Sequence, residues 1–352
     1  MPKRIYIHIG RPKVGSTSLQ HFLWGARDAL LEQGILYPQS AMHHKASHHL
    51  AFVLDPDSSE HQRSVKLDPE GTYRKIFEEA EESDASTIVA SSENLFLIEP
   101  KLVKPLIPRD WEAKIVCYVR RQDEVLASSY IQELKTGQIA KGTDIHEYAR
   151  DGLRLSLLDY ELVLDKWSVQ FGKKNMIVRP FEAEHMRTTI AEDFLSVAGA
   201  DTSVFDFTDT RLNSSPARDV LDFLSLINEA PGIQENQRFR LREPLLAASD
   251  WLGSEGQYDS AGILPKNLRE EVMSHFAQSN AAVARNYLGR RDGLLFRNLE
   301  YHDPPEYQGL DLSRFAAMVA TLFSFQQDSI LKLQVQVNRL RRELLEEKNK
   351  ER

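Results

Sequence analysis

The chain has 352 residues, and its 44 Lys and Arg against 52 Asp and Glu give a formal net charge of −8. With a hydrophobic fraction of 41%, this length excludes wholesale disorder and suits one large domain or two modest ones. The acidic balance disfavours a general nucleic-acid binder, and the single cysteine excludes an internal disulfide or a thiolate-rich zinc site.

Membrane and export signals are missing from the sequence pattern. No apolar run reaches the roughly 18 residues that a membrane span needs, and the first residues lack the apolar core of a secretory signal. The lone Cys117 fits a reducing compartment. We therefore expect a cytoplasmic protein that does not cross a membrane, with peripheral contact to a membrane surface left open.

The chain opens with a strand, a glycine loop and a helix. Residues 3–9 read KRIYIHI, in which three isoleucines alternate with Tyr6 and His8, and the apolar run stops at Gly10. This alternation predicts a strand that ends in a loop. Residues 16–31 place apolar side chains at helical spacing behind a cluster of Ser and Thr, which predicts a helix.

Further short apolar runs predict the rest of a sheet. They lie at residues 34–38 (GILYP), 87–90 (TIVA), 115–119 (IVCYV) and 176–178 (MIV). The longer intervals between them leave room for crossover helices. Such alternation of strands and helices predicts an α/β fold in three layers, with a central, mostly parallel sheet flanked by helices.

The C-terminal part of the sequence is helical. From about residue 213 to residue 291 apolar residues recur at helical spacing, and Pro304-Pro305 then breaks the chain. We expect a catalytic domain over residues 1–308 and a helical extension over 309–352. In the extension Phe323, Ile330, Val337 and Leu344 recur every seven residues, and Leu333 and Leu340 lie at the intervening positions of the same apolar seam. This seam predicts a coiled coil and a homodimer through residues 322–347. The alternative is a single amphipathic helix packed on the catalytic body.

The first loop has the chemistry of an anion site. After the first strand the sequence runs Gly10-Arg11-Pro12-Lys13-Val14-Gly15-Ser16-Thr17 and opens a helix, a context in which backbone N–H groups bind phosphate. The loop is P-loop-like, but a Walker A motif has its lysine directly after the second glycine, and here the lysine is Lys13. No later strand runs into an evident magnesium-binding aspartate. An ordinary strand-to-helix turn is the alternative.

A second basic turn follows the strand at 115–119. Arg120 and Arg121 stand at its end, and Ser128 lies eight residues beyond Arg120, two turns into a predicted helix. An arginine and a hydroxyl placed in this way can converge on one phosphate. The alternative is a salt bridge from either arginine to Asp123 or Glu124.

Together these two motifs resemble those of the sulfotransferases that use 3′-phosphoadenosine 5′-phosphosulfate (PAPS), particularly bacterial members related to carbohydrate sulfotransferases. The shared pattern is a strand, PKxGST and a helix, followed later by a strand, R-x7-S-x-Y, and it extends over residues 3 to about 298. The resemblance implies PAPS as the sulfuryl donor, released as 3′-phosphoadenosine 5′-phosphate, with no metal ion required.

The resemblance also implies roles for individual residues. Lys13 would neutralise the bridging oxygen of the phosphosulfate, while Arg120 and Ser128 would hold the 3′-phosphate. The rest of the donor loop would surround the 5′-phosphate: Arg11, Val14, Gly15, Ser16, Thr17 and Ser18. Relatives often carry Thr or Ser in place of Val14 and Thr in place of Ser16, changes that leave the backbone donors in place.

Transfer of a sulfuryl group needs a base to take the proton of the acceptor. Glu93 follows the strand at 87–90, at the sheet edge where ligands bind, and carbohydrate sulfotransferases use a glutamate near this point. The alternatives are His48 and His49 in the histidine-rich run 43–49. That run could instead bind an acceptor or a metal, and Glu93 could instead cap a helix.

Lesser basic and polar candidates lie further along the chain. Arg211, Asn213, Ser214, Arg290 and Arg291 could complete a phosphate or acceptor subsite, or serve as solvated charges and helix caps. Three arginines alternate in the run QRFRLRE at Arg238, Arg240 and Arg242. We expect them in a plain surface turn, and their use by an anionic acceptor is the alternative.

The predicted function is transfer of a sulfuryl group from PAPS to a hydroxyl, or less readily an amine, of a glycan or glycolipid. Two alternatives belong to other classes. One is an ATP-dependent small-molecule kinase, which the position of Lys13 and the missing magnesium aspartate disfavour. The other is a non-catalytic scaffold that acts through its coiled coil.

Overall fold

The computed structural model describes residues 2–11, 13–56, 68–140, 142–182, 189–208, 216–252 and 260–350. The chain forms two compact units. Unit 1 contains Met1–Leu126, Ala149–Asn213 and Pro265–His302, and unit 2 contains Ala127–Tyr148, Ser214–Leu264 and Asp303–Arg352. The domain boundary expected between residues 308 and 309 stays a prediction.

A five-stranded sheet forms the centre of unit 1. Its strands are β1 (Lys3–His8), β2 (Ile35–Leu36), β3 (Thr87–Ser91), β4 (Trp111–Val119) and β5 (Met176–Pro180), in the order β2-β3-β1-β4-β5. Each of the four pairings among these described strands is parallel. This confirms the α/β, P-loop-like class expected from the alternating strand and helix patterns.

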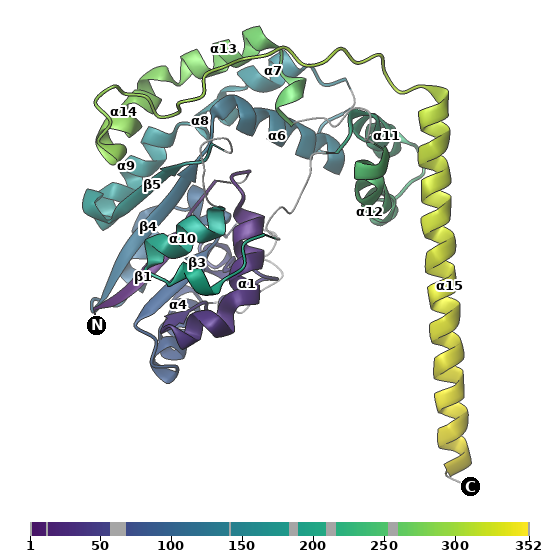
Figure 1. Cartoon of the computed structure of the whole chain (residues 1–352), viewed down its shortest axis with the longest axis horizontal. Helices are drawn as coiled ribbons and strands as arrows, with labels where there is room; N and C mark the ends of the chain where they lie inside the picture. Colours follow the sequence, from purple (N-terminus) through teal and green to yellow (C-terminus); the bar gives the residue numbers. More distant parts are fainter. Residues whose placement is uncertain are drawn as a thin grey trace. The chain divides into compact units, whose positions relative to one another are not determined.

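Helices cover both faces of the sheet, so unit 1 has three layers (Figure 1). One face packs against α4 (Pro69–Glu82), α9 (Tyr160–Phe171) and α14 (Ala277–Leu288). The other packs against α1 (Ser16–Glu32) and α10 (Ile190–Ala198). The shorter elements of unit 1 are α2 (His49–Phe52), η1 (Glu93–Leu97), α5 (Pro100–Val103), η2 (Lys104–Leu106), α8 (Gly152–Ser156), η3 (Lys173–Asn175), η4 (Thr202–Val204) and α13 (Lys266–His275).

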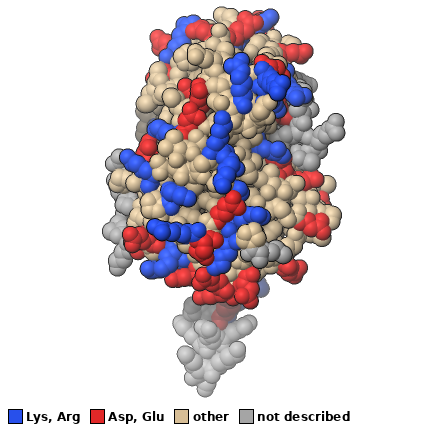
Figure 2. Space-filling model, turned by 90° about the vertical axis from the view of Figure 1, so that its left-hand side faces the viewer, with Lys and Arg blue, Asp and Glu red and all other residues tan. Residues whose placement is uncertain are grey.

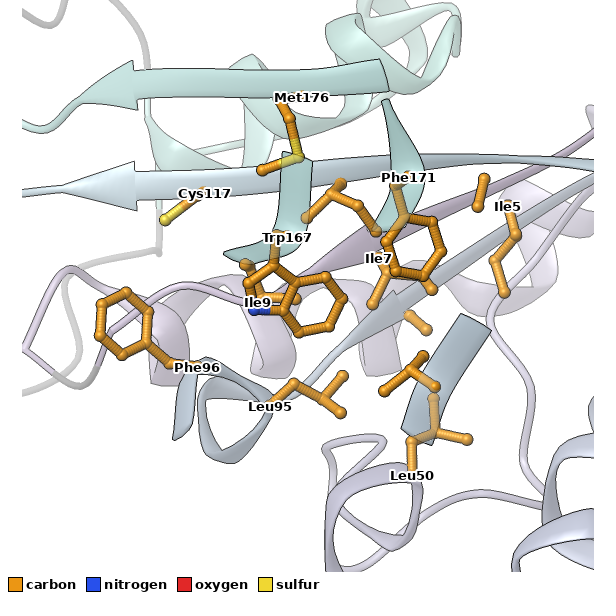
Figure 3. Packing of buried hydrophobic residues seen from close by; sticks show 14 of the residues in the cluster. Ile5, Ile7, Ile9, Leu50, Leu95, Phe96, Cys117, Trp167, Phe171 and Met176 are labelled. Carbon is orange, nitrogen blue, oxygen red and sulfur yellow. The ribbon is translucent and has the colours of Figure 1, made fainter. Parts of the chain in front are cut away.

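The alternation seen in the first strand fixes which residues face which layer. Ile5 and Ile7 of β1 point into the larger core, where Trp167 and Phe171 of α9 pack (Figure 3). Tyr6, between them, belongs to the opposite core with α1 and α10. Because both faces of a parallel sheet are covered, β1 is buried on both sides, which holds its carboxyl end rigidly.

Unit 2 is helical. It contains most of α6 (Gln122–Thr136), which begins in unit 1, and the first residues of α7 (Ile145–Arg150). It also contains α11 (Arg218–Glu229), α12 (Glu235–Leu252), η5 (Ser260–Ile263) and α15 (Leu312–Lys350). Its apolar core joins three of these helices: Val220 and Phe223 of α11, Leu245 of α12 and Met318 of α15 are buried together.

The last helix, α15, is continuous over 39 residues. Near its start it packs on α11 and α12: Met318 is buried, and the Phe315 ring lies 5.2 Å from that of Phe223. Further along, the apolar side chains at the predicted seam are 43–62% exposed: Phe323, Ile330, Leu333, Val337 and Leu340. The long C-terminal helix is therefore confirmed, while the coiled coil and the homodimer stay predictions.

Two further observations concern the charges on the surface and the hydropathy of the helices. Figure 2 shows one face of the molecule on which Lys and Arg side chains are interspersed with Asp and Glu side chains. Among the helices of the described residues, none has the length and apolar character needed to cross a membrane.

Candidate functional site

Three strand ends meet at one edge of the sheet. In the parallel register His8 of β1 lies beside Ser91 of β3 and Val116 of β4. Beyond the strands the backbone stays paired, because the Ser92 N–H donates to His8 O at 3.0 Å and the Ile9 N–H donates to Val116 O at 2.9 Å. The loops after β1 and β3 therefore leave the sheet side by side, and β4 continues at the same edge to Val119 before its own loop begins.

The loop after β1 has a strained backbone. Gly15, at the N-cap of α1, has φ 85° and adopts the left-handed conformation that glycine tolerates. Lys13 also has a positive φ, 78°, which is costly for a residue with a long side chain. A non-glycine residue held in this region by its surroundings is typical of a loop that is shaped around a ligand.

Gly10 lies directly over a buried histidine. A Cβ atom at residue 10 would be 2.1 Å from His8 Nε2, so only glycine fits there without movement of the histidine ring. His8 is fully buried, its Nδ1 lies 2.8 Å from Ser91 Oγ, and its Nε2 has no hydrogen-bond partner among the described residues. Burial lowers the pKa of His8 to about 3, so the ring is neutral at pH 7.

A pH-dependent stability follows from this neutral histidine. The unfolded chain binds a proton at His8 below about pH 6.5, and the folded chain binds it only near pH 3, so acid favours unfolding. Between pH 7 and pH 5 His8 alone is expected to remove about 2 kcal/mol of unfolding free energy. Urea denaturation at both pH values should show a smaller loss for His8→Asn than for the wild-type chain. An equal loss in the two proteins would contradict the buried neutral ring.

The N-terminus of α1 supplies further donors to the loop. Ser16 is buried and its Oγ has no hydrogen-bond partner among the described residues. Thr17 is exposed and Ser18 is half-buried. Val14, one of the two departures from the motif that the loop resembles, is fully buried in the core with α1 and α10. Its apolar side chain therefore anchors the loop. The N–H donors of the loop belong to the backbone, so they do not depend on which side chain residue 14 carries.

Arg120 reaches the loop from the end of β4. Its Nη1 donates to the carbonyl oxygen of Lys13 at 3.2 Å, and its Nε donates to Glu124 Oε2 at 2.5 Å. The guanidinium also lies 5.9 Å from the ring of Phe181. Two basic residues from motifs far apart in the sequence are therefore neighbours. The salt bridge to Glu124, the alternative foreseen for this turn, is present as well.

Arg121 has a structural role. It is buried and donates from Nη2 to Asp123 Oδ2 at 2.9 Å, while Arg269 donates to the same oxygen at 2.8 Å. Arg121 Nη1 also donates to the carbonyl oxygen of Asn298 at 2.8 Å. The side chain thus ties β4 to α13 and to the segment after α14, and the salt-bridge interpretation is the correct one for this residue.

Arg11 and Ser128, also predicted to bind the donor, do not share the contact between Arg120 and Lys13. The Arg11 guanidinium donates to the carbonyl oxygen of Leu157 and lies 5.7 Å from the ring of Phe96, contacts that hold the loop on unit 1. Ser128 is on α6 in unit 2. The roles of Arg11 and Ser128 in donor binding stay predictions.

Glu93 is held by a residue of the loop helix. It begins η1 just after β3, and its Oε2 accepts a 2.5 Å hydrogen bond from Nε2 of Gln20. Gln20 is buried on α1, one turn after Ser16, and its Nε2 also lies 3.4 Å from Ser91 Oγ. The helix that starts at the anion loop therefore positions the carboxylate that follows β3.

His48 faces the same carboxylate. The Ser47 N–H donates to Ser91 O at 2.9 Å, which brings the histidine-rich run beside β3. His48 Nδ1 lies 2.9 Å from Ser92 Oγ and 3.2 Å from Asn94 Nδ2. Burial lowers the pKa of His48 more than the charge of Glu93 raises it. His48 Nδ1 is therefore engaged by polar groups of the segment that follows β3.

Three of the four histidines of the run lie around Phe52, and the fourth, His44, has its ring 4.4 Å from that of His43. The rings of His43, His48 and His49 lie 5.3, 5.6 and 6.4 Å from the Phe52 ring. Within the described ranges, no group of three or more His, Cys, Asp and Glu side chains has a metal-binding arrangement.

Sequence reasoning missed Gln20. The available signal was its place one turn from Ser16 and three residues before Leu23, on the buried face of α1. Of the lesser candidates, Arg290 Nη1 donates to the carbonyl oxygens of Leu294 and Leu295 and so fixes the turn after α14. Arg211, Asn213 and Ser214 lie outside the described residues.

The arginines of QRFRLRE lie on α12, so the prediction of a plain surface turn is wrong. Helical geometry places Arg238 and Arg242 one turn apart on the same side, whereas Arg240 between them is exposed.

Comparison with known proteins gives distant matches. No protein-family model matches the chain. An uncharacterised protein of Archaeoglobus fulgidus is 26% identical over 187 residues, which are 51% of this chain and 47% of that protein. The matched segment thus spans about half the length of this curated relative.

Two solved structures are also similar. A sulfotransferase from Alicyclobacillus acidocaldarius matches with a TM-score of 0.42 and 16% identity, over 59% of this chain and 85% of that one. The sulfotransferase domain from the curacin biosynthetic pathway matches with a TM-score of 0.31 and 13% identity, over 78% of this chain and 98% of that one.

Proposed function

We propose that the protein is a PAPS-dependent sulfotransferase. The observation that carries this proposal is the contact of Arg120 with the backbone of Lys13, because it joins the strained loop after β1 to the basic end of β4. A donor with phosphate groups at two ends of one nucleoside needs two such anion sites close together. The sequence motifs that resemble the sulfotransferase family are the same two elements.

The residues present fit the donor. The buried Ser16 Oγ, without a partner in the described residues, is at the N-terminus of α1, where an oxyanion would complete its hydrogen bonding. The backbone N–H groups of the first turn of α1, from Ser16 to Ser18, have no acceptor within the helix and can bind the same oxyanion. Lys13 would balance the charge on the bridging oxygen, and Arg120 would exchange part of its pairing with Glu124 for the 3′-phosphate.

The reaction moves one SO3 group. The acceptor hydroxyl oxygen forms a bond to sulfur while the bond from sulfur to the 5′-phosphate oxygen breaks. The electron pair of that bond leaves with 3′-phosphoadenosine 5′-phosphate, where Lys13 stabilises the developing charge. The proton of the acceptor hydroxyl passes to the base, so atoms and charge balance without a metal ion.

Glu93 is better suited than His48 to act as the general base. Its Oε2 is oriented by Gln20, and an ionised carboxylate can accept a proton in this position. His48 Nδ1 is already engaged with Ser92 Oγ and Asn94 Nδ2, so this nitrogen is not open to the proton of the acceptor. We assign His48 to binding of the acceptor.

The acceptor is a hydroxyl, or an amine, of a glycan or glycolipid. The experiment that tests the function is transfer of label from [35S]PAPS to polysaccharide and lipid fractions, run with EDTA and without added metal. We expect labelled product in a glycan or glycolipid fraction, and no turnover of ATP with Mg²⁺. Mg²⁺-dependent ATP turnover without sulfuryl transfer would favour the kinase, and neither activity in the folded chain would favour the scaffold.

The exposed stripe of α15 is the surface for a second copy of the chain. A parallel two-stranded coiled coil is favoured by β-branched residues at one seam position and leucine at the other. The stripe has this combination, with Ile330 and Val337 at the first position and Leu333 and Leu340 at the second. The flanking positions are mostly uncharged: Gln327, Ser329, Gln334 and Gln336. Two identical stripes can therefore approach without repulsion between like charges.

A pair of leucine variants tests this dimer. Leu333→Glu places a charge at the seam and is expected to turn the dimer into a monomer, since burying an unpaired carboxylate is costly. Leu331→Glu is the matched control, because Leu331 is 63% exposed and lies outside the seam. Sedimentation equilibrium should give twice the chain mass for the wild type and the control. A monomeric wild-type chain would contradict the prediction.

A further inference from the structure

Three basic side chains lie on two helices of unit 2. Lys135 lies in the last turn of α6, and Arg238 and Arg242 are one turn apart on α12. The end of α6 is fixed on α11, because Asn228 Nδ2 donates to the carbonyl oxygen of Leu134 at 2.8 Å. α12 is held in turn by Leu245, which is fully buried in the core of unit 2. The cluster is therefore built on rigid helices.

The two arginines lack the partners that such groups normally have. The Nε atoms of Arg238 and Arg242 are both buried, and neither has a hydrogen-bond partner among the described residues. Arg238 Nη2 makes one long contact, 3.4 Å, to the carbonyl oxygen of Ala230. Arg242 lies 5.7 Å from the ring of Phe239. In the part of the chain that the structure describes, neither guanidinium is within salt-bridge distance of a carboxylate.

Lys135 adds a third positive charge, which burial and the neighbouring Arg242 destabilise. Burial lowers the pKa of Lys135, the charge of Arg242 lowers it further, and the exposed carboxylate of Glu243 raises it. Buried N–H donors without acceptors, next to cations that repel one another, are costly in a folded protein unless something compensates them. An anion with several acceptor oxygens would satisfy the donors and the charge at once.

We propose that Lys135, Arg238 and Arg242 form an oxyanion-binding site in unit 2. The ligand chemistry is a sulfate, phosphate or carboxylate group, which offers oxygens to the two Nε–H donors and a negative charge to Lys135. Such a group is available from a free inorganic anion or from an acidic saccharide. The proposal does not depend on the proposed sulfotransferase activity.

The test is calorimetric titration of the full chain with sodium sulfate, sodium phosphate and a sulfated tetrasaccharide. We expect saturable binding of at least one probe, weakened at least tenfold in the double variant Arg238→Gln, Arg242→Gln. The matched control is Arg240→Gln, which removes the same charge from an exposed position of the same helix and should change affinity less than twofold. Stronger binding of the tetrasaccharide than of either inorganic anion identifies a saccharide as the source, and equal binding identifies a free oxyanion.

Several outcomes would overturn the proposal. The first is that no probe binds saturably to the folded wild-type chain. The second is that Arg240→Gln weakens the affinity for the probe as much as the double variant does. If the double variant unfolds, Lys135→Met replaces it, because methionine keeps the length of the buried stem and removes the charge; unchanged affinity in that variant also overturns the site. PAPS titrated into the double variant keeps the two proposals distinguishable, since neither Arg238 nor Arg242 is among the residues assigned to the donor.

Discussion

Replacing Lys13 or Arg120 by alanine is expected to weaken PAPS binding by about 10-fold to 100-fold. Each side chain would supply a charge-assisted hydrogen bond to a phosphate or phosphosulfate oxygen, and such bonds contribute about 1.5–3 kcal/mol. The contact between Arg120 Nη1 and the Lys13 carbonyl makes the two positions neighbours, so each loss should appear in the same binding event. Calorimetric titration of each variant with PAPS measures the effect.

The backbone of Lys13 requires its own control. At φ 78° alanine is as strained as lysine, whereas glycine is not, so Lys13→Gly separates the lost side chain from the strained loop. Both variants should lose affinity to a similar degree. For Arg120 the control is Arg74→Ala, which removes an exposed arginine paired with Glu78 on α4. Unchanged affinity in both Lys13→Ala and Arg120→Ala would remove the basis for the donor assignment.

Glu93→Gln is expected to leave PAPS affinity within twofold and to lower kcat by about 100-fold to 10,000-fold. The amide oxygen of the new glutamine can still accept from Gln20, so the local structure is preserved while the group that takes the proton is lost. Steady-state rates with a sulfuryl acceptor, together with PAPS titration, measure the two effects separately.

His48→Asn is the comparison that identifies the base. Asparagine keeps a polar group near Ser92, and if His48 only binds the acceptor, KM should rise while kcat falls less than in Glu93→Gln. A Glu93→Gln enzyme that stays active beside an inactive His48→Asn enzyme would make His48 the base. The hydrogen bond between Gln20 and Glu93 would then have a structural role only.

Much of unit 1 could be predicted from local sequence patterns. Alternating isoleucines located β1, and short apolar runs located β3, β4 and β5, because strands buried on both faces need such runs. The order of strands and loops then placed Lys13 and Arg120 at one edge, since parallel strands share their carboxyl ends. The neighbouring positions of these two residues followed from topology alone.

The parts that could not be predicted depend on contacts between distant segments. Gln20 meets Glu93 across 73 positions of sequence, and nothing near either residue shows which partner it has. Unit 2 joins three separate stretches of the chain around Met318 and Leu245. The arginines of α12 alternate with other residues and precede Pro244, a pattern typical of a turn, yet burial of Leu245 in the unit 2 core holds them in a helix.

The most direct test of the central claim is calorimetric titration of the folded wild-type chain with PAPS and, separately, with ATP in the presence of Mg²⁺. Two adjacent anion sites predict saturable binding of PAPS that EDTA does not change, and at least tenfold weaker binding of ATP, which lacks the 3′-phosphate. A chain that stays folded, as circular dichroism would show, and yet binds no PAPS would contradict the claim.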